Sequence, residues 1–444
     1  MVQYCLMFEK MGLPTAPIVT ATFSNVVKKV AFNLGMPNLR FTFTPHPITG
    51  MDLEVCRKYL RGNDPLTDQP LLNESAEAIT KPLSEDDKKT GMLEVPRERL
   101  LAPDTAENLE KLFLDNYWTD FMTITMPTEE RVAEMLSGTS RRPDEIVGRM
   151  QASGPHPMYT YNVEMVATCA VMAGARPEYL PVILAIASTG ATSLFTSTTS
   201  FSRMVVVNGP IRHELEMNSG IGALGPFNHA NATIGRAWTI VSRCLSRSGL
   251  PGQNYMGSLG NPLSYNNLCF PEKEERLPEG WNPLHVQRGF KKDESVVSIF
   301  TGFGMTHADT SFMGPLHPQI PYYLKFTNPD AGGFMILDPT VADRLKSEGF
   351  DTKEELIQWA WENTKIKVDD YWNKYQLVQI FILPRAQNGV EPFASWLKLP
   401  PDALIPQYPS KGMINIVVLG GETQEFWQLG DHVFVASTSV DAWR

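Results

Sequence analysis

The residue types best suited to binding and chemistry gather in one stretch near the middle of the chain, from Val205 to Arg236. Glycines recur in it, and amide, guanidinium and hydroxyl side chains are dense between them. Glycine lets a ligand approach the backbone closely, and these side chains supply hydrogen-bond donors and acceptors. The stretch is therefore expected to bind a small polar or anionic ligand. Its candidate ligand-binding residues are Asn208, Gly209, Arg212, Asn218, Gly220, Asn231, Thr233 and Arg236.

Groups that can exchange protons flank the same stretch. His213, Glu214 and His229 are candidates for a general acid and base, with the alternative that each histidine is only a packed or surface residue. Glu178 is expected in the first turn of a helix, where the helix dipole favours a carboxylate. It is either a general base, a ligand to a substrate ammonium, or only a cap. Acid–base work would require a partly buried site that tunes its pKa.

Further candidates lie downstream. Tyr265 and Cys269 stand among several asparagines, and Cys269 is the cysteine most open to a reactive role, with a buried inert thiol as the alternative. His285 and Gly421 complete the ligand-binding candidates. His285 and His307 have no further histidine or carboxylate at ligand spacing, so no metal site is predicted, and no cofactor is identified.

The elements that must position these residues form a strand, a loop and a helix. The apolar run from Val205 predicts a strand that breaks at Asn208, and a helix is expected from about Asn231. Unpaired N–H groups and the macrodipole make a helix start attractive to anions. The competing hypothesis is structural, because glycines often serve turns and asparagine is a common cap. The buried face of the helix is predicted to contain Ile234, Ala237, Trp238, Val241 and Leu245.

Composition excludes several classes of protein. The chain has 444 residues, is 43% hydrophobic and has a formal net charge of −10, which disfavours nonspecific binding to nucleic acid or anionic membranes. No apolar run reaches the length of a membrane span and no signal peptide is evident, so a cytoplasmic location is expected. Five cysteines without a Cys-x-x-Cys pair argue against a disulfide framework.

The order of elements predicts an α/β fold in several parts. Residues 1–63 are expected to form a truncated half of a doubly wound sheet, and residues 64–103 a linker or surface arm. Residues 104–330 should form the main α/β domain and residues 331–444 a C-terminal α/β lobe, with two similar lobes around a cleft as a possibility. The buried strand at 414–419 delivers Gly420 and Gly421 at its carboxyl end, where this second glycine turn could meet the first across a cleft.

Two groups of short motifs resemble a known family. The first lies at the N-terminus and comprises Phe8-Glu9-Lys10-Met11-Gly12-Leu13-Pro14-Thr15, Leu34-Gly35-Met36-Pro37 and Pro45-His46-Pro47-Ile48-Thr49-Gly50. These motifs resemble the second half of the UGSC (seleno)protein domain and, more distantly, the selenoprotein subunit of glycine reductase. In that family a selenocysteine or cysteine followed by Gly-Ser-Cys precedes this helix. Cys5 has no Gly-Ser-Cys after it, so the redox role is not transferred to it.

The second group is similar to long UGSC proteins with a C-terminal extension. It includes Val171-Met172-Ala173-Gly174-Ala175-Arg176-Pro177-Glu178-Tyr179, Val207-Asn208-Gly209-Pro210-Ile211-Arg212 and Ala230-Asn231-Ala232-Thr233-Ile234-Gly235-Arg236. His229 departs from the pattern, in which an arginine is expected, and this change could alter ligand choice or pH response. The resemblance implies an architecture and a redox association, not a substrate.

Two functions follow as hypotheses. One is an enzyme of oxidoreductase or lyase type that acts on a small polar, anionic or thiol-containing substrate. The other is a noncatalytic subunit that completes a partner chain bearing the Gly-Ser-Cys motif. A homodimer, or a hetero-oligomer with a chain that completes the N-terminal sheet, is expected because an open sheet edge needs cover.

Overall fold

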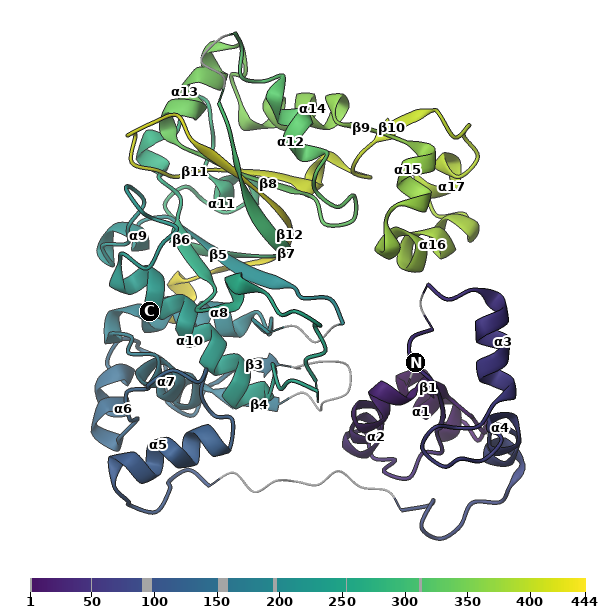
Figure 1. Ribbon diagram of the computed structural model, residues 1–444. Helices are drawn as coiled ribbons and strands as arrows, with labels where there is room; N and C mark the ends of the chain where they lie inside the picture. The colour runs from purple at the N-terminus through teal and green to yellow at the C-terminus, as the bar shows by residue number, and fades with distance from the viewer. Residues whose placement is uncertain are drawn as a thin grey trace.

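The computed structural model describes residues 2–48, 50–89, 98–150, 159–194, 198–252, 254–310 and 314–444. Helices and strands alternate along the chain, and six of the strands form one mixed sheet. The predicted α/β class is confirmed. In Figure 1 the chain passes from an N-terminal unit (purple) into the body that contains the sheet.

The N-terminal unit, residues 2–89, has its own small core. Strands β1 and β2 pair in parallel, with Ile18 opposite Thr42, and helix α2 makes the crossover between them. This is the helix-connected parallel pair that the sequence predicts. Residues 64–103 are expected to form a linker or surface arm. The structure instead has a helix at residues 71–80, and this helix contacts β2. The elements of the unit are α1 (Val2–Lys10), β1 (Ile18–Thr20), η1 (Ala21–Phe23), α2 (Ser24–Asn33), β2 (Thr42–Thr44), α3 (Leu53–Arg61) and α4 (Leu71–Thr80).

A helical layer with a short hairpin follows. Thr105 caps α5 by accepting a hydrogen bond from the Asn108 N–H. Thr128 and Asn162 cap α6 and α7 in the same way. The elements are α5 (Ala106–Asp115), α6 (Glu129–Leu136), β3 (Ile146–Met150), β4 (Tyr159–Asn162), α7 (Val163–Met172), η2 (Pro177–Tyr179) and α8 (Leu180–Ser188).

The central sheet has the strand order β11-β8-β12-β7-β5-β6. Its strands are β5 (Ser202–Asn208), β6 (Leu268–Pro271), β7 (Val296–Ala308), β8 (Gly333–Leu337), β11 (Ile414–Val418) and β12 (Trp427–Ser439). The helices between them are α9 (Ile211–Glu214), α10 (His229–Ser246), η3 (Pro262–Ser264), η4 (Glu274–Arg276), α11 (Leu284–Gln287), α12 (Gln319–Leu324), α13 (Pro339–Ser347) and α14 (Lys353–Asn363). The domain boundary predicted between residues 330 and 331 falls inside this sheet. Strands β5, β6 and β7 precede residue 330, and β8, β11 and β12 follow it.

The sheet consists of two halves with the same topology. In the first half β5 pairs in parallel with β6 on one side and antiparallel with β7 on the other. In the second half β8 pairs in parallel with β11 and antiparallel with β12 in the same way. The long strands β7 and β12 join the halves in antiparallel fashion. An approximate twofold relation thus links β5, β6 and β7 to β8, β11 and β12, in the same chain order.

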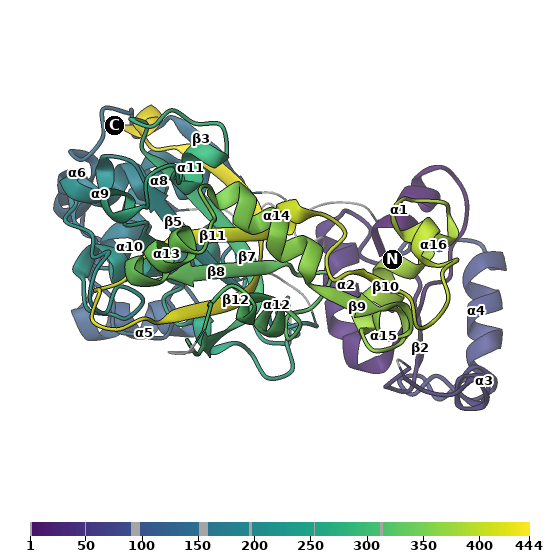
Figure 2. The same cartoon turned by 90° about the horizontal axis from the view of Figure 1, so that it is seen from above.

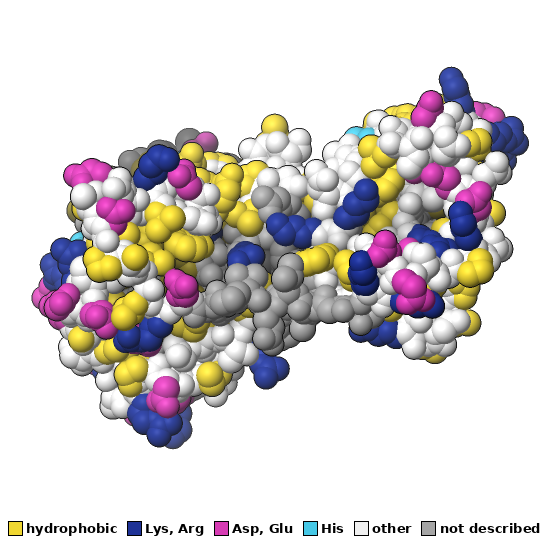
Figure 3. Space-filling model, turned by 90° about the horizontal axis from the view of Figure 1, so that it is seen from below, with side chains coloured by type: hydrophobic (Ala, Val, Ile, Leu, Met, Phe, Trp, Pro, Cys, Tyr) yellow, Lys and Arg dark blue, Asp and Glu magenta, His cyan; other side chains and the backbone are white. Residues whose placement is uncertain are grey.

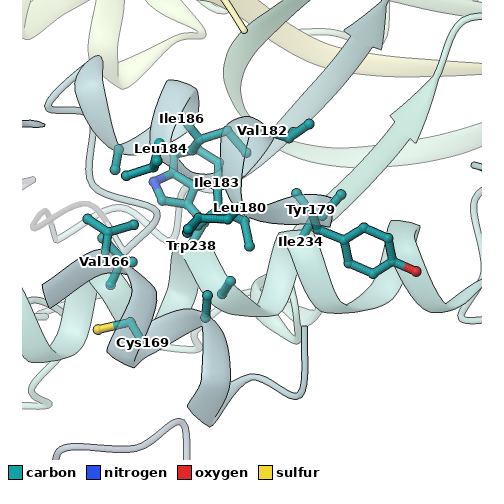
Figure 4. Close-up of a cluster of buried hydrophobic side chains, with 14 of the residues drawn as sticks. Val166, Cys169, Tyr179, Leu180, Val182, Ile183, Leu184, Ile186, Ile234 and Trp238 are labelled. Carbon is teal, nitrogen blue, oxygen red and sulfur yellow. The ribbon is translucent and has the colours of Figure 1, made fainter. Parts of the chain in front are cut away.

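Alternate residues of the strands enter different cores. Val205 and Val207 pack with α7, α8 and α10, and Met335 and Leu337 pack with α13 and α14. The opposite side chains of the same strands, including Phe334, form a third core shared by the two halves. Figure 4 shows Trp238 and Ile234 of α10 with the α8 side chains of the first core, and Figure 2 shows α13 and α14 over β8 and β11. The predicted buried face of α10 is confirmed.

The ends of the two outer strands meet, so the sheet curls around the shared core. The Lys273 N–H, just after β6, donates to the Val418 carbonyl at the end of β11 over 2.8 Å. Strong right-handed twist in long strands such as β7 and β12 favours this curling. The carboxyl ends of β6 and β11 therefore lie next to each other.

A satellite of residues 365–406 is inserted between α14 and β11. It has its own core, which includes Tyr371, Trp372 and Trp396. Its elements are β9 (Lys365–Lys367), α15 (Val368–Asn373), η5 (Val378–Ile382), α16 (Leu383–Gln387), α17 (Phe393–Trp396) and β10 (Leu404–Pro406); the remaining short helices of the chain are η6 (Lys411–Met413) and η7 (Asp441–Trp443). In the described ranges, no helix is both long and apolar enough to cross a membrane.

On the face drawn in Figure 3, charges of both signs are mixed. Lys and Arg side chains lie beside Asp and Glu side chains, with hydrophobic side chains exposed between them. Such mixing gives nucleic acid no continuous basic surface on the described part of that face.

Candidate functional site

Asn231 joins the start of α10 to the first glycine loop. The helix begins at His229, two residues before the predicted start, and the Asn228 side chain accepts the Asn231 N–H. The buried Asn231 side chain accepts from the Asn218 N–H and donates to the carbonyls of Asn218 and Ala223. Asn218 in turn accepts the Gly220 N–H. Asn231 and Asn218 thus hold the loop in shape, and their polar atoms are used within the protein.

The carboxyl edge of β5 and β6 is closed by ion pairs and hydrogen bonds. Asn208 is fully buried and donates to Glu272 Oε2 and Glu274 Oε1 at 2.8 and 3.0 Å. The Gly209 N–H donates to the same Glu274 oxygen at 2.7 Å. Lys353 reaches into this edge from the start of α14 and lies 2.6 Å from Glu272 Oε1. These contacts engage the side-chain nitrogen of Asn208 and the N–H of Gly209, both predicted ligand-binding residues, with protein carboxylates.

Arg212 and His285 belong to the same closed edge. The guanidinium of Arg212 lies 3.1 Å from Glu274 and 3.2 Å from Glu275, and it also donates to the Glu272 carbonyl. His285 is fully buried, with Nε2 3.3 Å from the Lys292 carbonyl. Both side chains stabilise the junction between β6 and α11.

Arg236 and Thr233 make contacts along α10 itself. Arg236 forms a two-point ion pair with Asp120, at 2.8 and 3.1 Å, and donates to the Thr123 carbonyl. Thr233 donates to the His229 carbonyl one turn earlier. Arg236 therefore fastens α10 to the segment after α5, away from the glycine loop.

Three of the predicted catalytic residues do converge, in a polar hollow of about 350 Å³ at the start of α10. Glu178, Glu214 and His229 line it together with Arg176 and Tyr179. His229 Nδ1 lies 3.4 Å from the Tyr179 hydroxyl, which points away from the apolar cluster in Figure 4.

Charged groups of both signs surround His229 and Tyr179 in this hollow. Burial lowers the pKa of His229, Arg176 lowers it further and Glu178 opposes them. Burial raises the pKa of Tyr179. Glu214 is engaged by Arg444 at 2.6 and 3.0 Å. The hollow thus joins a neutral imidazole to a protonated phenol, with one guanidinium and several carboxylates beside them.

Cys269, Tyr265 and His213 lie apart from the hollow and from one another. Cys269 is buried, and this burial raises the pKa of its thiol to about 12, which keeps it protonated and unreactive at neutral pH. Tyr265 is 80% exposed. His213 is 66% exposed, with Nε2 3.8 Å from Glu275.

A cleft of about 340 Å³ opens between the two glycine turns. One wall is the loop 220–225, and the other contains Gly420 and Gly421 after β11. The Gly420 N–H donates to the Ser219 carbonyl at 3.0 Å, so the turns are in direct contact. A Cβ at 421 would lie 2.3 Å from Ile221 Cγ1, so only glycine lets the turns approach this closely. The expectation that the two turns meet is confirmed.

The rest of the cleft comes from strand ends on the second half of the sheet. Ile336 of β8 and Leu419 after β11 form part of its inner wall, with Trp427 at the start of β12. His307, near the end of β7, lies on the wall with its Nε2 3.1 Å from Asp309. Open α/β sheets bind ligands outside the carboxyl ends of parallel strands, which is the location of this cleft. Its polar side chains are those of His307, Asp338, Thr423, Gln424 and Gln428.

Of the ligand-binding candidates, only Gly220 and Gly421 line the cleft. Asp338 was identifiable in the sequence only as a helix cap, and His307 only as an isolated histidine. The sequence did contain a signal for this cleft. Asp338 and Gly420 each follow an apolar run typical of a parallel strand, and ligands bind at the carboxyl ends of such strands. Gln428 had no such signal, since its place depends on the pairing of β12 with β7.

Comparison with known proteins gives one match, to a protein-family model. Residues 1–62 match the UGSC family model. No curated protein and no solved structure matches the chain. The matched segment covers α1, β1, α2, β2 and α3, and it precedes the body that contains the cleft. This N-terminal segment is therefore similar to the UGSC family.

Proposed function

We propose that the protein is an enzyme of oxidoreductase or lyase type that acts on a small polar substrate held between the two glycine turns. The observation that carries this proposal is the contact of loop 220–225 with Gly421 around a cleft at the carboxyl ends of β8 and β11. A concave, mostly apolar hollow with a few polar groups is the usual form of a small-molecule site. The UGSC relationship of residues 1–62 supports the redox association.

The contrast between the two halves of the sheet also supports this location. The carboxyl edge of β5 and β6 is filled by the pairs of Lys353 with Glu272 and Arg212 with Glu274. The related edge of β8 and β11 opens into the cleft. The ligand site predicted from residues 208–236 is therefore proposed to lie at the second half of the sheet. Gly220 is part of both sites.

A cleft-filling variant tests the proposal. Thr423 is an exposed residue on the cleft wall, so Thr423→Trp should block the cleft while the fold persists. Thr80→Trp, at an exposed position on α4, is the matched control. A screen of small carbonyl compounds, thiols and carboxylates for binding and turnover should give hits that the control retains and Thr423→Trp loses. Hits that bind equally well to Thr423→Trp would contradict the proposal.

The noncatalytic hypothesis is the second candidate, and one observation favours it. Helix α1 and the residue after it leave Tyr4, Met7 and Met11 exposed at 66, 48 and 66%. Strands β1 and β2 have no further strand partner among the described residues. Exposed apolar side chains beside an open sheet edge suit a protein partner. Full-length protein with turnover in isolation would favour the enzyme, whereas activity only with a chain that carries Gly-Ser-Cys would favour the subunit.

A further inference from the structure

We infer that the cleft takes an uncharged substrate that presents a carbonyl oxygen to the glycine turns and an apolar body to the inner wall. This inference rests on the proposed function and narrows its substrate class. The charges, the hydrogen-bond donors and the apolar surface of the cleft all favour such a substrate.

The cleft offers an anion no lysine or arginine to pair with, and the imidazole of His307 on its wall already lies 3.1 Å from the Asp309 carboxylate. Among the described residues that line the cleft there is no Lys or Arg, and its one carboxylate, Asp338, is 8% exposed. That carboxylate accepts from the Thr340 N–H and hydroxyl through Oδ1 and from the Glu422 N–H through Oδ2. It is thus held as a hydrogen-bond acceptor. A substrate anion would lose water there and approach a fixed negative charge, which is unfavourable without a partner.

Two cations that hold the second glycine turn are already neutralised by carboxylates. Lys273 donates to the Gly420 carbonyl at 3.0 Å and to Glu422 at 2.9 Å. Arg276 donates to Glu422 and Asp343 at 2.9 and 3.0 Å. Both side chains hold the second glycine turn in place from outside the cleft, and neither is left to bind a substrate carboxylate.

A substrate ammonium would find few acceptors. Both carboxylate oxygens of Asp338 are engaged, and the side-chain oxygens on the wall belong to Thr423, Gln424 and Gln428. An ammonium would be attracted by the Asp338 charge but would meet oxygens that already accept hydrogen bonds, so the hydration it loses in a mostly apolar hollow offsets that attraction. The charge balance therefore favours an uncharged ligand.

The glycine turns provide backbone N–H donors for a ligand. The N–H groups of Ile221, Gly222, Gly421 and Thr423 have no acceptor anywhere in the described ranges. Backbone N–H groups that lack a partner are costly when water is excluded, so a ligand oxygen that accepts from them is stabilised. A carbonyl oxygen has two lone pairs that can accept from these donors. It carries no charge, so it needs no cation as a partner.

The inner wall sets the remainder of the ligand. Ile336, Leu419 and Trp427 are all buried, at 3, 4 and 2% exposure, and they line the end of the cleft nearest the sheet. Loop residues Ala223 and Leu224 add to this apolar surface. A volume of about 340 Å³ lies at the low end of the range for drug-sized ligands. A ring or branched chain attached to the carbonyl fits this size and surface.

The test uses probes that share one body and differ in charge. Benzamide and acetophenone present an uncharged carbonyl, benzoate a negative charge and benzylamine a positive charge. Binding to the full-length protein is measured by ligand-observed NMR and calorimetry, with Thr423→Trp and Thr80→Trp alongside. Benzamide and acetophenone are expected to bind at least tenfold more tightly than the charged probes, and Thr423→Trp should abolish this binding.

The outcomes separate the inference from the proposed function. If benzoate or benzylamine binds as tightly as benzamide and is lost in Thr423→Trp, the cleft is a ligand site but the uncharged class is wrong. If no probe binds in a manner sensitive to Thr423→Trp, the inference and the proposed site both fail.

A second variant tests the role of charge directly. Asp338→Asn removes the negative charge from the wall, and circular dichroism establishes that the fold is kept. The preference for benzamide over benzoate should fall at least threefold in this variant. An unchanged preference would show that Asp338 does not set the charge of the substrate and would overturn that part of the inference.

Discussion

Lys353 and Glu272 form a fully buried ion pair, with Nζ 2.6 Å from Oε1 and neither side chain exposed. Lys353 begins α14, which belongs to the second half of the sheet, whereas Glu272 follows β6 in the first half. Glu272 also accepts the Leu284 N–H at 2.7 Å and the Val418 N–H at 3.4 Å. The Glu272 carboxylate therefore joins both halves of the sheet at the edge where their outer strands meet. The next residue, Lys273, holds the second glycine turn.

Removal of one partner from this pair should be strongly destabilising. Lys353→Met leaves the Glu272 carboxylate buried without its cation, and a loss of about 3–5 kcal/mol in the free energy of unfolding is expected. The double variant Lys353→Met/Glu272→Gln should recover much of this loss, because no charge is then unpaired. Urea unfolding measures both variants.

The matched control for this pair is Lys88→Met. Lys88 pairs with Glu85 at 2.7 Å on the surface, where the side chains are 54 and 89% exposed. Solvent screens such pairs, so little change in stability is expected. A loss in Lys353→Met no larger than in the control would show that the buried pair does not bind the halves together.

Asn231 should control the order of the first glycine loop. Asn231→Ala removes hydrogen bonds to the Asn218 N–H and to the carbonyls of Asn218 and Ala223, at roughly 1 kcal/mol each. Faster amide hydrogen exchange in residues 218–225 is expected together with lower stability. Thr233→Ala, which removes a bond within α10, should leave exchange in the loop as it is. Equal exchange in the two variants would argue against the role of Asn231.

Gly209 should tolerate no side chain. Its φ is +84°, and a Cβ would lie 2.2 Å from the Glu294 carbonyl oxygen. Gly389 has nearly the same φ, +81°, with open space around it. Ala at either position incurs the cost of the left-handed conformation, about 1 kcal/mol, but only Gly209→Ala adds a steric cost of roughly 1–3 kcal/mol. Chemical denaturation of the two alanine variants gives the difference directly, and equal losses would refute the steric account.

Cys269 should react with alkylating reagents more slowly than the half-buried cysteines. Burial raises the pKa of its thiol to about 12, so the thiolate fraction at about pH 8 is on the order of 10⁻⁴. Iodoacetamide should modify the half-buried Cys5 and Cys56 first and reach Cys269 only after unfolding. Mass spectrometry of the labelled peptides checks the order, with urea-unfolded protein as the control. Rapid labelling of Cys269 in the native protein would restore it as a reactive thiol.

His432 should make stability fall in mild acid. It is fully buried beside Ser202, with Nε2 3.1 Å from the hydroxyl, and burial lowers the pKa of its imidazole from 6.5 to about 4. The unfolded chain therefore binds an extra proton between these two values. Stability from this group is complete above about pH 6.5 and falls as the pH drops toward 4, by roughly 2 kcal/mol at about pH 5.

The His432→Gln variant isolates this effect from the carboxylates that titrate in the same range. The free energy of unfolding of the wild type should decline more steeply than that of the variant between about pH 7.5 and pH 5. Parallel curves would mean that another group causes the acid sensitivity.

Local sequence determined most of the elements of this protein. The spacing of Ile234 and Trp238 fixed the buried face of α10. The alternation of strands and helices established the α/β class, and glycines after an apolar run placed a second turn at residues 420 and 421. Each of these inferences rests on side chains within one or two turns of each other, where spacing alone decides what is buried.

Only the tertiary structure decided which of these residues share a site. Asn208 and Arg212 carry the groups expected of a ligand site, yet Glu272, Glu274 and Lys353 fill the space beside them. Gly220 and Gly421 meet because the two halves of the sheet join through β7 and β12 and curl until their outer edges touch. Contacts between residues so distant in the chain depend on strand order and twist, which leave no periodic trace in the sequence.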